Sequence, residues 1–352
     1  MSFQRQWFPP KYGSGLTAEA LLLEKYLSRK EFGIAKKHII SLKDREDKEY
    51  WERMHLRLEH IEKFKSSKQS KRKLKVAFYG FWPDFNPYTN PILLLIKTSA
   101  PEIRLVVTEN LNEASIIIFS CFGDHSSVLQ NIRHSTRWLY LGENVRPNYY
   151  NYDFSLSFDI SDYGGKNVHV PLWLFEISKL NPQGYSLSNL TKDREIDYSQ
   201  RKNAIAYVGN NSVPMREYLM TYLESKGYQC DRYGSQTNPI DDKIGLYSKY
   251  KVVIAMENSY HMGYVTEKLL HAHLGGAHVI YSGGINYESP LNACKDHIIC
   301  LDDNLKNLIP FIEGAFNKQK FYKQEKLVDE ISFHIYFGKI LNAIRDRIRC
   351  YL

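Results

Sequence analysis

The sequence predicts an α/β fold with two domains, and three observations lead to this prediction. The chain has 352 residues, a length that suits two packed domains better than one small domain. Short apolar runs alternate with polar, helix-compatible spacers, which is typical of parallel sheets whose strands are joined by crossover helices. This pattern occurs twice, on either side of a polar stretch at 181–201 that contains Pro, Gly and Ser. We therefore expect two Rossmann-like domains that face a central cleft, preceded by an N-terminal helical region.

The composition excludes several classes of protein. Charged residues make up 24% and hydrophobic residues 43% of the chain, which excludes wholesale disorder. The five cysteines are scattered without a C-x-x-C pair, which argues against a disulfide scaffold or a zinc knuckle and favours a reducing compartment. There is neither an apolar leader nor a run of about 18 apolar residues, so we expect no secretory signal and no membrane-spanning helix. The net charge of +8 leaves nucleic acid, an anionic membrane surface and a phosphorylated small molecule open as partners.

Residues 1–72 predict a helical extension that ends in a basic linker. Apolar residues recur at helical spacing, first at 21–27 and again at 51–61. The segment 61–75 then carries seven basic residues against one acidic residue. A solvated hinge is the simplest interpretation of this run, and contact with a lipid surface or nucleic acid is the alternative.

The first α/β domain is predicted at 73–190. Its strands are expected at 74–82, 105–107, 115–120 and 136–141. The last of these strands leads into Gly142, Glu143 and Asn144, so a carboxylate stands at a glycine turn. A carboxylate in this position can act as the general base that removes a proton from a sugar hydroxyl. A turn acid that makes only local hydrogen bonds is the alternative.

The second α/β domain is predicted at 191–330, and a C-terminal helix follows at 331–352. Its strands are expected at 203–209, 228–234, 250–257 and 278–281, with helices at 215–226 and 266–273. The C-terminal helix is basic and amphipathic, with Arg345, Arg347 and Arg349. Packing onto a domain is the favoured interpretation of this helix, and contact with a membrane surface is the alternative.

Several familiar catalytic motifs are absent. The sequence has no G-x-G-x-x-G and no G-x-x-x-x-G-K-[ST] motif, so dehydrogenases and P-loop kinases lose their main support. It also has no G-x-S-x-G elbow and no H-E-x-x-H pair. No D-x-D pair is present that could hold a divalent ion on a diphosphate.

The most informative segment is 256–268. A buried strand ends at Glu257 and Asn258, and a short loop leads to a helix that begins at Thr266, Glu267 and Lys268. Helix N-terminal amides attract phosphate, and nucleotides bind at the carboxyl ends of strands in doubly wound sheets. A lysine there neutralises a diphosphate, and the adjacent glutamate can accept hydrogen bonds from a ribose, so the pair suits a nucleotide sugar. A helix cap, a first-turn acid and a surface charge are the alternative interpretation of these three residues.

A second strand–turn–helix segment lies at 207–216. Arg216 falls on the first turn of its helix, from which a guanidinium can reach the same diphosphate with two parallel hydrogen bonds. An ordinary exposed arginine is the alternative.

These segments, in this order, resemble the glycosyltransferase family 10 fucosyltransferases, especially the bacterial α-1,3/4 enzymes. The strongest match is 250–259 (Y-K-V-V-I-A-M-E-N-S) followed by 263–268 (G-Y-V-T-E-K), which is similar to the donor motif of the family. Met256 stands where the family usually has Phe, a change of similar volume that we expect to be harmless. The resemblance covers roughly residues 74–310.

A weaker match lies in the first domain. Gly142, Glu143 and Asn144, followed by Pro147 and Asn148, are similar to the G-E-N segment of the bacterial members. Residues 1–72 match none of the family motifs.

The resemblance implies a GT-B fold and an inverting enzyme that transfers L-fucose from GDP-β-L-fucose. An α-1,3 linkage to a GlcNAc-containing acceptor is the product it implies. Glu143 would be the general base, Arg216 and Lys268 would hold the diphosphate of the leaving group, and Glu267 would bind the ribose hydroxyls. The other residues that would line the donor site are Gly142, Asn258 and Tyr264. No cofactor is implied beyond the donor substrate, and a divalent metal is not expected to be essential.

Two other functions remain as alternatives. One is a GT-B glycosyltransferase that uses a different GDP sugar, and the other is a non-enzymatic basic RNA-binding protein. The leading interpretation predicts GDP-fucose and an oligosaccharide or lipid-linked glycan as partners, and no nucleic acid. It places the protein in the cytoplasm, with peripheral contact to the inner face of the membrane.

Overall fold

A computed structural model describes most of the chain and divides it into two compact units. The first unit consists of described residues within 18–170 and 337–351, and the second unit consists of those within 171–336. The described ranges are 18–42, 47–66, 73–145, 151–210, 213–234, 238–293, 295–301 and 305–351. Most of the predicted basic linker, at 67–72, therefore lies outside the described residues.

The first unit contains a six-stranded parallel sheet with strand order β2-β1-β3-β4-β5-β6. Its strands are β1 (Leu74–Tyr79), β2 (Leu105–Val107), β3 (Ile116–Phe119), β4 (Thr136–Tyr140), β5 (Phe154–Ser157) and β6 (Asn167–His169). The helices α4 (Pro91–Ser99) and α5 (Ser126–Asn131) connect strands. The helix α4 begins where Asn90 accepts a hydrogen bond from the backbone of Leu93 at 2.8 Å, with Pro91 at the first helical position.

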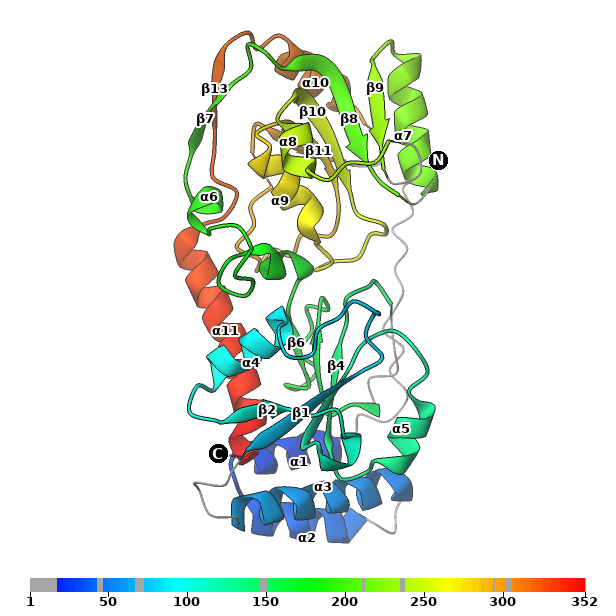
Figure 1. The fold of residues 1–352 in the computed structure, drawn as a ribbon, viewed down its shortest axis with the longest axis vertical. Helices are drawn as coiled ribbons and strands as arrows, with labels where there is room; N and C mark the ends of the chain where they lie inside the picture. The colour runs from blue at the N-terminus through cyan, green and yellow to red at the C-terminus, as the bar shows by residue number, and fades with distance from the viewer. Residues whose placement is uncertain are drawn as a thin grey trace. The chain divides into compact units, whose positions relative to one another are not determined.

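The predicted N-terminal helices belong to this unit. They are α1 (Ala18–Ser28), α2 (Phe32–Leu42) and α3 (Lys48–Ser66), and Figure 1 shows them lying together at one end of the sheet. Buried ion pairs link them to the sheet. Arg53 donates to both carboxylate oxygens of Asp153, at 2.5 and 3.1 Å, and Arg57 pairs with Glu24 and donates to Thr136 at 3.0 Å. The helical region is thus an integral part of the first unit.

The second unit contains a five-stranded parallel sheet with strand order β12-β11-β10-β8-β9. Its strands are β8 (Lys202–Val208), β9 (Cys230–Tyr233), β10 (Tyr250–Met256), β11 (His278–Ser282) and β12 (Ile298–Cys300). The helices are α6 (Ser188–Thr191), α7 (Pro214–Ser225), α8 (Lys243–Tyr247), α9 (Glu267–Leu274) and α10 (Leu308–Phe316). All seven residues of β10 are buried, as expected for the central strand of a sheet covered on both faces. A separate antiparallel pair joins β7 (Arg194–Asp197) to β13 (Phe321–Gln324).

The two units divide after residue 170, whereas the sequence places the join at 181–201. The reason is that apolar side chains within the polar stretch are buried in the second unit. Leu190 is fully buried, and its carbonyl accepts a hydrogen bond from the backbone of Leu327 at 2.9 Å. Tyr198 is 1% exposed, and its hydroxyl lies 2.6 Å from Nδ1 of His278. The polar composition of the segment 181–201 gives no indication of these buried contacts.

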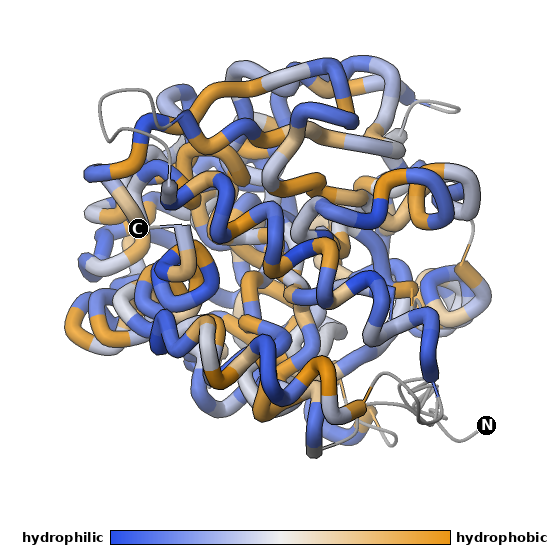
Figure 2. The backbone as a smooth tube through the Cα atoms, turned by 90° about the horizontal axis from the view of Figure 1, so that it is seen from below, coloured by the Kyte–Doolittle hydropathy of each residue, from blue (hydrophilic) through white to orange (hydrophobic). Residues whose placement is uncertain are grey.

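The C-terminal helix α11 (Glu330–Ile348) is followed by a short turn of 3-10 helix, η5 (Arg349–Tyr351). Within the first unit, Arg345 pairs with Glu102 at 2.5 Å and Arg347 pairs with Glu24 at 3.1 Å. These two arginines therefore help to pack the C-terminal helix onto the first unit, which is the interpretation that the sequence favours. Figure 2 shows hydrophilic and hydrophobic residues interspersed along the helices, and none in the described ranges has the length and apolarity needed to cross a bilayer.

Three buried histidines of the second unit predict that acid destabilises the fold. Nδ1 of His273 lies 3.3 Å from Nε2 of His297, and the His278 ring packs against Tyr198 and Tyr322; none of the three histidines is more than 2% exposed. Burial lowers the pKa of His278 to about 3 and that of His297 to about 4, and it lowers the pKa of His273 well below 6.5. Below the unfolded pKa of about 6.5, the unfolded chain binds more protons, so stability falls as the pH drops.

We expect each of these histidines to remove about 1.4 kcal/mol of unfolding free energy per pH unit below 6.5. Denaturant titrations at pH 7.5 and 5.5 measure this loss. Replacing the exposed His334 by Gln is the control and should leave the pH dependence unchanged. Equal unfolding free energies at the two pH values would contradict the prediction.

Candidate functional site

The predicted donor residues of the second unit meet at the carboxyl ends of β8 and β10. The strand β8 leads through a turn to α7, and β10 leads through a loop to α9. Both strands run in the same direction, so the two helix N-termini lie at one edge of the sheet. The predicted residues Asn211 and Ser212 of the first turn lie outside the described residues.

Arg216 is buried at this edge rather than exposed. Its residue surface is 2% exposed, and Nη2 donates to the carbonyl oxygen of Met256 at 2.6 Å and to Oδ1 of Asn258 at 2.8 Å. Its guanidinium carbon lies 5.7 Å from the centre of the Tyr207 ring. The structure therefore brings together two of the predicted donor residues, Arg216 and Asn258, from separate segments of the sequence.

Lys268 is held by oxygen atoms on three residues. Its Nζ lies 2.8 Å from Oγ1 of Thr266, 3.2 Å from Oε2 of Glu257 and 3.7 Å from Oε1 of Glu267. Thr266 is the N-cap of α9, but its side chain makes no capping hydrogen bond. The Thr266 hydroxyl and backbone N–H both donate to Glu257, at 2.6 and 2.8 Å. Thr266 is thus the N-cap that the alternative interpretation expects, and Lys268 is an ion-paired, partly buried lysine.

Glu267 lies between two lysines. Oε1 of Glu267 is 3.4 Å from Nζ of Lys243, which lies in α8. Burial raises the pKa of Glu267, but Lys268 and Lys243 outweigh burial and lower this pKa to about 2. The carboxylate is therefore ionised at neutral pH and can accept hydrogen bonds from hydroxyl groups. Sequence reasoning missed Lys243, because α8 is only five residues long and has no recognisable motif.

Tyr264 is buried in the loop between β10 and α9, at 2% exposure. The loop depends on close backbone contacts. Gly263 has a φ of +93°, which favours glycine, and its backbone N–H donates to Gly284 at 2.5 Å. A side chain on Gly284 would meet the backbone of His261, because a Cβ there would lie 1.8 Å from its carbonyl oxygen. These glycines fix the path that brings α9 to the end of β10.

Glu143 lies in the first unit, at the carboxyl end of β4, and it is exposed. The Tyr140 ring packs against Gly142, and the thiol of Cys121 lies near the backbone of Gly142 and Glu143. The predicted residues Pro147 and Asn148 lie outside the described residues. The structure therefore places Glu143 in a different unit from Arg216 and Lys268.

Aromatic residues gather at the same edge of the first sheet. The Phe81 ring stacks on Phe85 with a centroid distance of 4.0 Å and lies parallel to Tyr140 at 6.1 Å. Trp82, whose ring is 5.1 Å from that of Phe85, is 44% exposed. Trp82 is thus the exposed member of this cluster, whereas Phe81 and Phe85 are partly buried.

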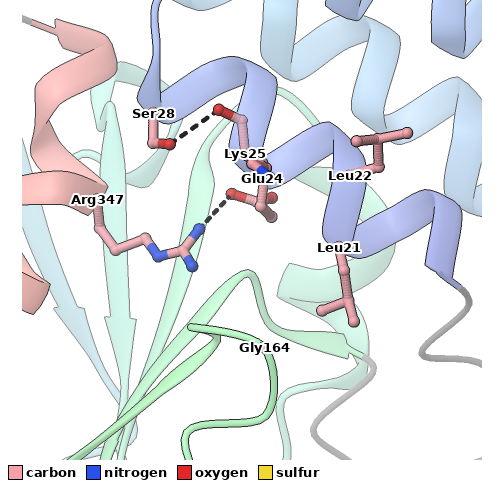
Figure 3. Close-up of a pocket in the computed structure, with 7 residues that line it drawn as sticks. All are labelled: Leu21, Leu22, Glu24, Lys25, Ser28, Gly164 and Arg347. Carbon is pink, nitrogen blue, oxygen red and sulfur yellow. Dashed lines mark hydrogen bonds and ion pairs between the residues drawn. The ribbon is translucent and has the colours of Figure 1, made fainter.

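A separate hollow of about 380 Å³ lies in the first unit, between α1, Gly164 and α11 (Figure 3). Figure 3 shows the Arg347 side chain directed toward Glu24, to which it donates at 3.1 Å. Because these two charges neutralise each other, we assign the hollow to the structural ion pairs of this unit. Among the described residues, no group of three or more His, Cys, Asp or Glu side chains is arranged to hold a metal ion.

Two family models match the chain, one in each half. The model of the alpha-(1,3)-fucosyltransferase FucT N-terminal domain matches residues 76–176, and the C-terminal model of glycosyltransferase family 10 (fucosyltransferase) matches residues 198–324. The alpha-(1,3)-fucosyltransferase FucT of Helicobacter pylori is 24% identical over 264 residues, covering 65% of this chain and 54% of that protein. The chain thus spans about half the length of this curated relative.

Solved structures of alpha1,3-fucosyltransferase share the fold. One is 19% identical with a TM-score of 0.54, covering 79% of this chain and 92% of the solved chain. Another, described as a complex with GDP-fucose, is 18% identical with a TM-score of 0.50, covering 80% and 95%. The predicted fold class, two α/β units of the GT-B type with an N-terminal helical region, is confirmed.

Proposed function

Because the chain belongs to glycosyltransferase family 10, the fucosyltransferases, we propose that it transfers L-fucose from GDP-β-L-fucose to a hydroxyl of a glycan acceptor. One observation carries this proposal. Arg216 from α7 and Lys268 from α9 both converge on residues 256–258 at the end of β10. Two cations at two helix N-termini are suited to a diphosphate.

The donor site is proposed to hold GDP through charge and hydroxyl contacts. Arg216 and Lys268 would bind the diphosphate and stabilise the charge that develops on it as the bond to fucose breaks. Glu267, kept ionised by Lys243 and Lys268, would accept hydrogen bonds from the ribose. Asn258, Tyr264 and Gly142 would line the donor site. In this proposal the side-chain cations do the work of a metal ion, so no metal is essential.

The reaction is proposed to invert the anomeric carbon. The acceptor oxygen attacks C1 of fucose, Glu143 takes the proton from that hydroxyl, and the electron pair of the breaking C1–O bond leaves with GDP. The exposure of Glu143 at a strand end supports this role. The proposed product has an α-1,3 linkage to a GlcNAc-containing acceptor, and the match to the alpha-(1,3)-fucosyltransferase FucT N-terminal domain supports the linkage.

The acceptor is proposed to be an oligosaccharide or a lipid-linked glycan. The aromatic residues around Trp82 lie at the carboxyl end of β1, on the same sheet edge as Glu143. An aromatic ring offers a flat apolar surface to the apolar face of a sugar. We further propose a cytoplasmic location, with the basic run at 63–75 drawn to an anionic membrane surface.

The proposal predicts that the protein binds GDP and distinguishes it from GMP through Lys268. Replacing Lys268 by Ala should weaken GDP binding by about tenfold, since a charge-assisted hydrogen bond is lost. GMP binding should change less than about threefold, because GMP lacks the β-phosphate. Titration calorimetry measures both affinities. The control, Lys323→Ala, removes a lysine that pairs with Asp193 on the surface of the same unit.

A transfer assay with a panel of GDP sugars and an N-acetyllactosamine acceptor tests the reaction itself. We expect turnover with GDP-fucose and rejection of GDP-mannose, because a pocket shaped around a 6-methyl group excludes a 6-hydroxyl. Turnover of another GDP sugar in place of GDP-fucose would overturn the choice of donor. A protein that ignored GDP and bound RNA with a steep salt dependence would overturn the enzymatic proposal.

A further inference from the structure

The buried carboxylate of Glu257 has no role in the proposed chemistry. It follows β10 directly, its side chain is fully buried, and its backbone N–H donates to Ser282 of the neighbouring strand at 2.8 Å. Burying a carboxylate is costly unless hydrogen bonds and an opposite charge compensate. Burial raises the pKa of Glu257, and its contacts with Lys268 and Thr266 oppose this effect by favouring the charged carboxylate.

The closest side-chain hydrogen bonds of Glu257 go to the start of α9, and Tyr281 of β11 lies on its other side. Oε1 accepts from the backbone N–H of Thr266 at 2.8 Å, and Oε2 accepts from the Thr266 hydroxyl at 2.6 Å. Oε2 also accepts from Nζ of Lys268 at 3.2 Å. One carboxylate thus fixes the N-cap of the helix and its first cation.

The residues on either side of Glu257 hold the other cation. Met256 and Asn258 accept the two hydrogen bonds described above from Arg216, which comes from α7. Three consecutive residues at the end of β10, 256–258, therefore hold two cations from two different helices. A lysine side chain has a flexible four-carbon stem, so Lys268 depends for its direction on the oxygen atoms around it, of which those of Thr266 and Glu257 are nearer than that of Glu267.

We propose that Glu257 is a positioning residue that holds the Lys268 ammonium where charge develops on the leaving diphosphate. This inference rests on the proposed function. Electrostatic stabilisation of a transition state depends on groups that are oriented before the reaction. Without the carboxylate, Lys268 keeps its charge and still attracts the diphosphate, but it must be reoriented during each turnover.

The expected effect is therefore on kcat rather than on affinity. Glu257→Gln keeps the size of the side chain and removes its charge. We expect kcat for fucosyl transfer to fall roughly 10- to 100-fold, as for a small misplacement of a reacting group. The KM for GDP-fucose and the Kd for GDP should change less than about threefold, since Lys268 keeps its charge. The control, Glu325→Gln, removes an exposed carboxylate that pairs with Lys295 at 2.8 Å in the same unit.

A double-mutant cycle separates positioning from general structural support. In a Lys268→Ala background, Glu257→Gln should change kcat by less than about threefold, because the group that it positions is gone. Calorimetric titration with GDP counts the folded sites, so kcat is expressed per GDP-binding site. Thr266→Val, which removes the hydroxyl between Glu257 and Lys268, should show the same dependence on background with a smaller loss.

An equal fall in kcat per site in both backgrounds would overturn the inference, since that is the result of structural support alone. Unchanged kcat in Glu257→Gln would overturn it as well. If the parent protein neither bound GDP nor transferred fucose, the proposed function itself would fail, and that outcome is visible before any variant is made.

Discussion

Replacing Glu143 by Gln is expected to lower kcat for fucosyl transfer by about 10²- to 10⁴-fold, the usual contribution of a general base. Gln keeps the size of the side chain but cannot accept the proton of the acceptor hydroxyl at neutral pH. Because Glu143 lies in the first unit and the cations Arg216 and Lys268 lie in the second, the affinity for GDP should stay within about twofold. Steady-state kinetics and calorimetry on the same preparation measure both quantities.

The matched control for this experiment is Glu113→Gln. Glu113 is another exposed carboxylate of the first unit, and it pairs with Lys75. Full activity in the control and a large loss in Glu143→Gln would support the assignment. If Glu143→Gln kept more than about a tenth of the parent kcat, the loss would be too small for a general base, and the role would pass to another residue.

Replacing Asp153 by Ala is expected to destabilise the first unit by about 3–5 kcal/mol, the usual cost of removing one partner from a buried ion pair. Arg53 and Arg57 would then be left buried without the carboxylate that lies 2.5 and 3.4 Å from them. The backbone N–H of Arg137 would also lose its acceptor at 2.8 Å. Burial raises the pKa of Asp153, but the two arginines outweigh burial and hold this pKa well below its usual value.

Hydrogen exchange and denaturant unfolding test this prediction together. Amides of α1, α3 and β4 should lose protection, because Asp153 joins these elements through Arg53 and Arg57, whereas amides of β10 in the second unit should not. The control, Asp193→Ala, removes an exposed carboxylate paired with Lys323 and should leave the unfolding midpoint unchanged. An unchanged midpoint in Asp153→Ala would show that the ion pairs do not stabilise the unit.

The sequence predicts the parts of this protein that local patterns encode. The sequence correctly predicts β10 from its run of apolar residues, and it predicts the loop before α9 from its glycine. Both predictions succeed because hydrophobic runs and turn residues are patterns of neighbouring residues in the chain. The short strands β5 and β6 escape prediction, since Ser155, Ser157 and Asn167 interrupt their apolar pattern. The structure explains why these polar residues can be buried in a sheet: the hydroxyls of both serines in β5 lie 2.7 Å from Oδ1 of Asn167 in β6.

Contacts between distant residues are the part that the sequence does not reveal. The motif at 256–268 identifies Lys268 and Glu267, but not the hydrogen bonds from Arg216 to Met256 and Asn258, which are 40 and 42 residues away. The pairing of Arg53 with Asp153 crosses 100 residues. Such pairs depend on how helices and strands pack, and no pattern within either segment specifies its partner.

The first unit is assembled from both ends of the chain, and this has a consequence for synthesis on the ribosome. The Tyr351 hydroxyl, beyond α11, lies 2.7 Å from that of Thr136 in β4 and donates to the backbone of Ser115 at 3.1 Å. The whole second unit, 171–336, is translated between these partners. All strands of the second unit therefore leave the ribosome before the part of α11 that completes the first unit has been synthesised. The first unit thus begins to be synthesised before the second unit, but its fold can be completed only after the second unit has been translated.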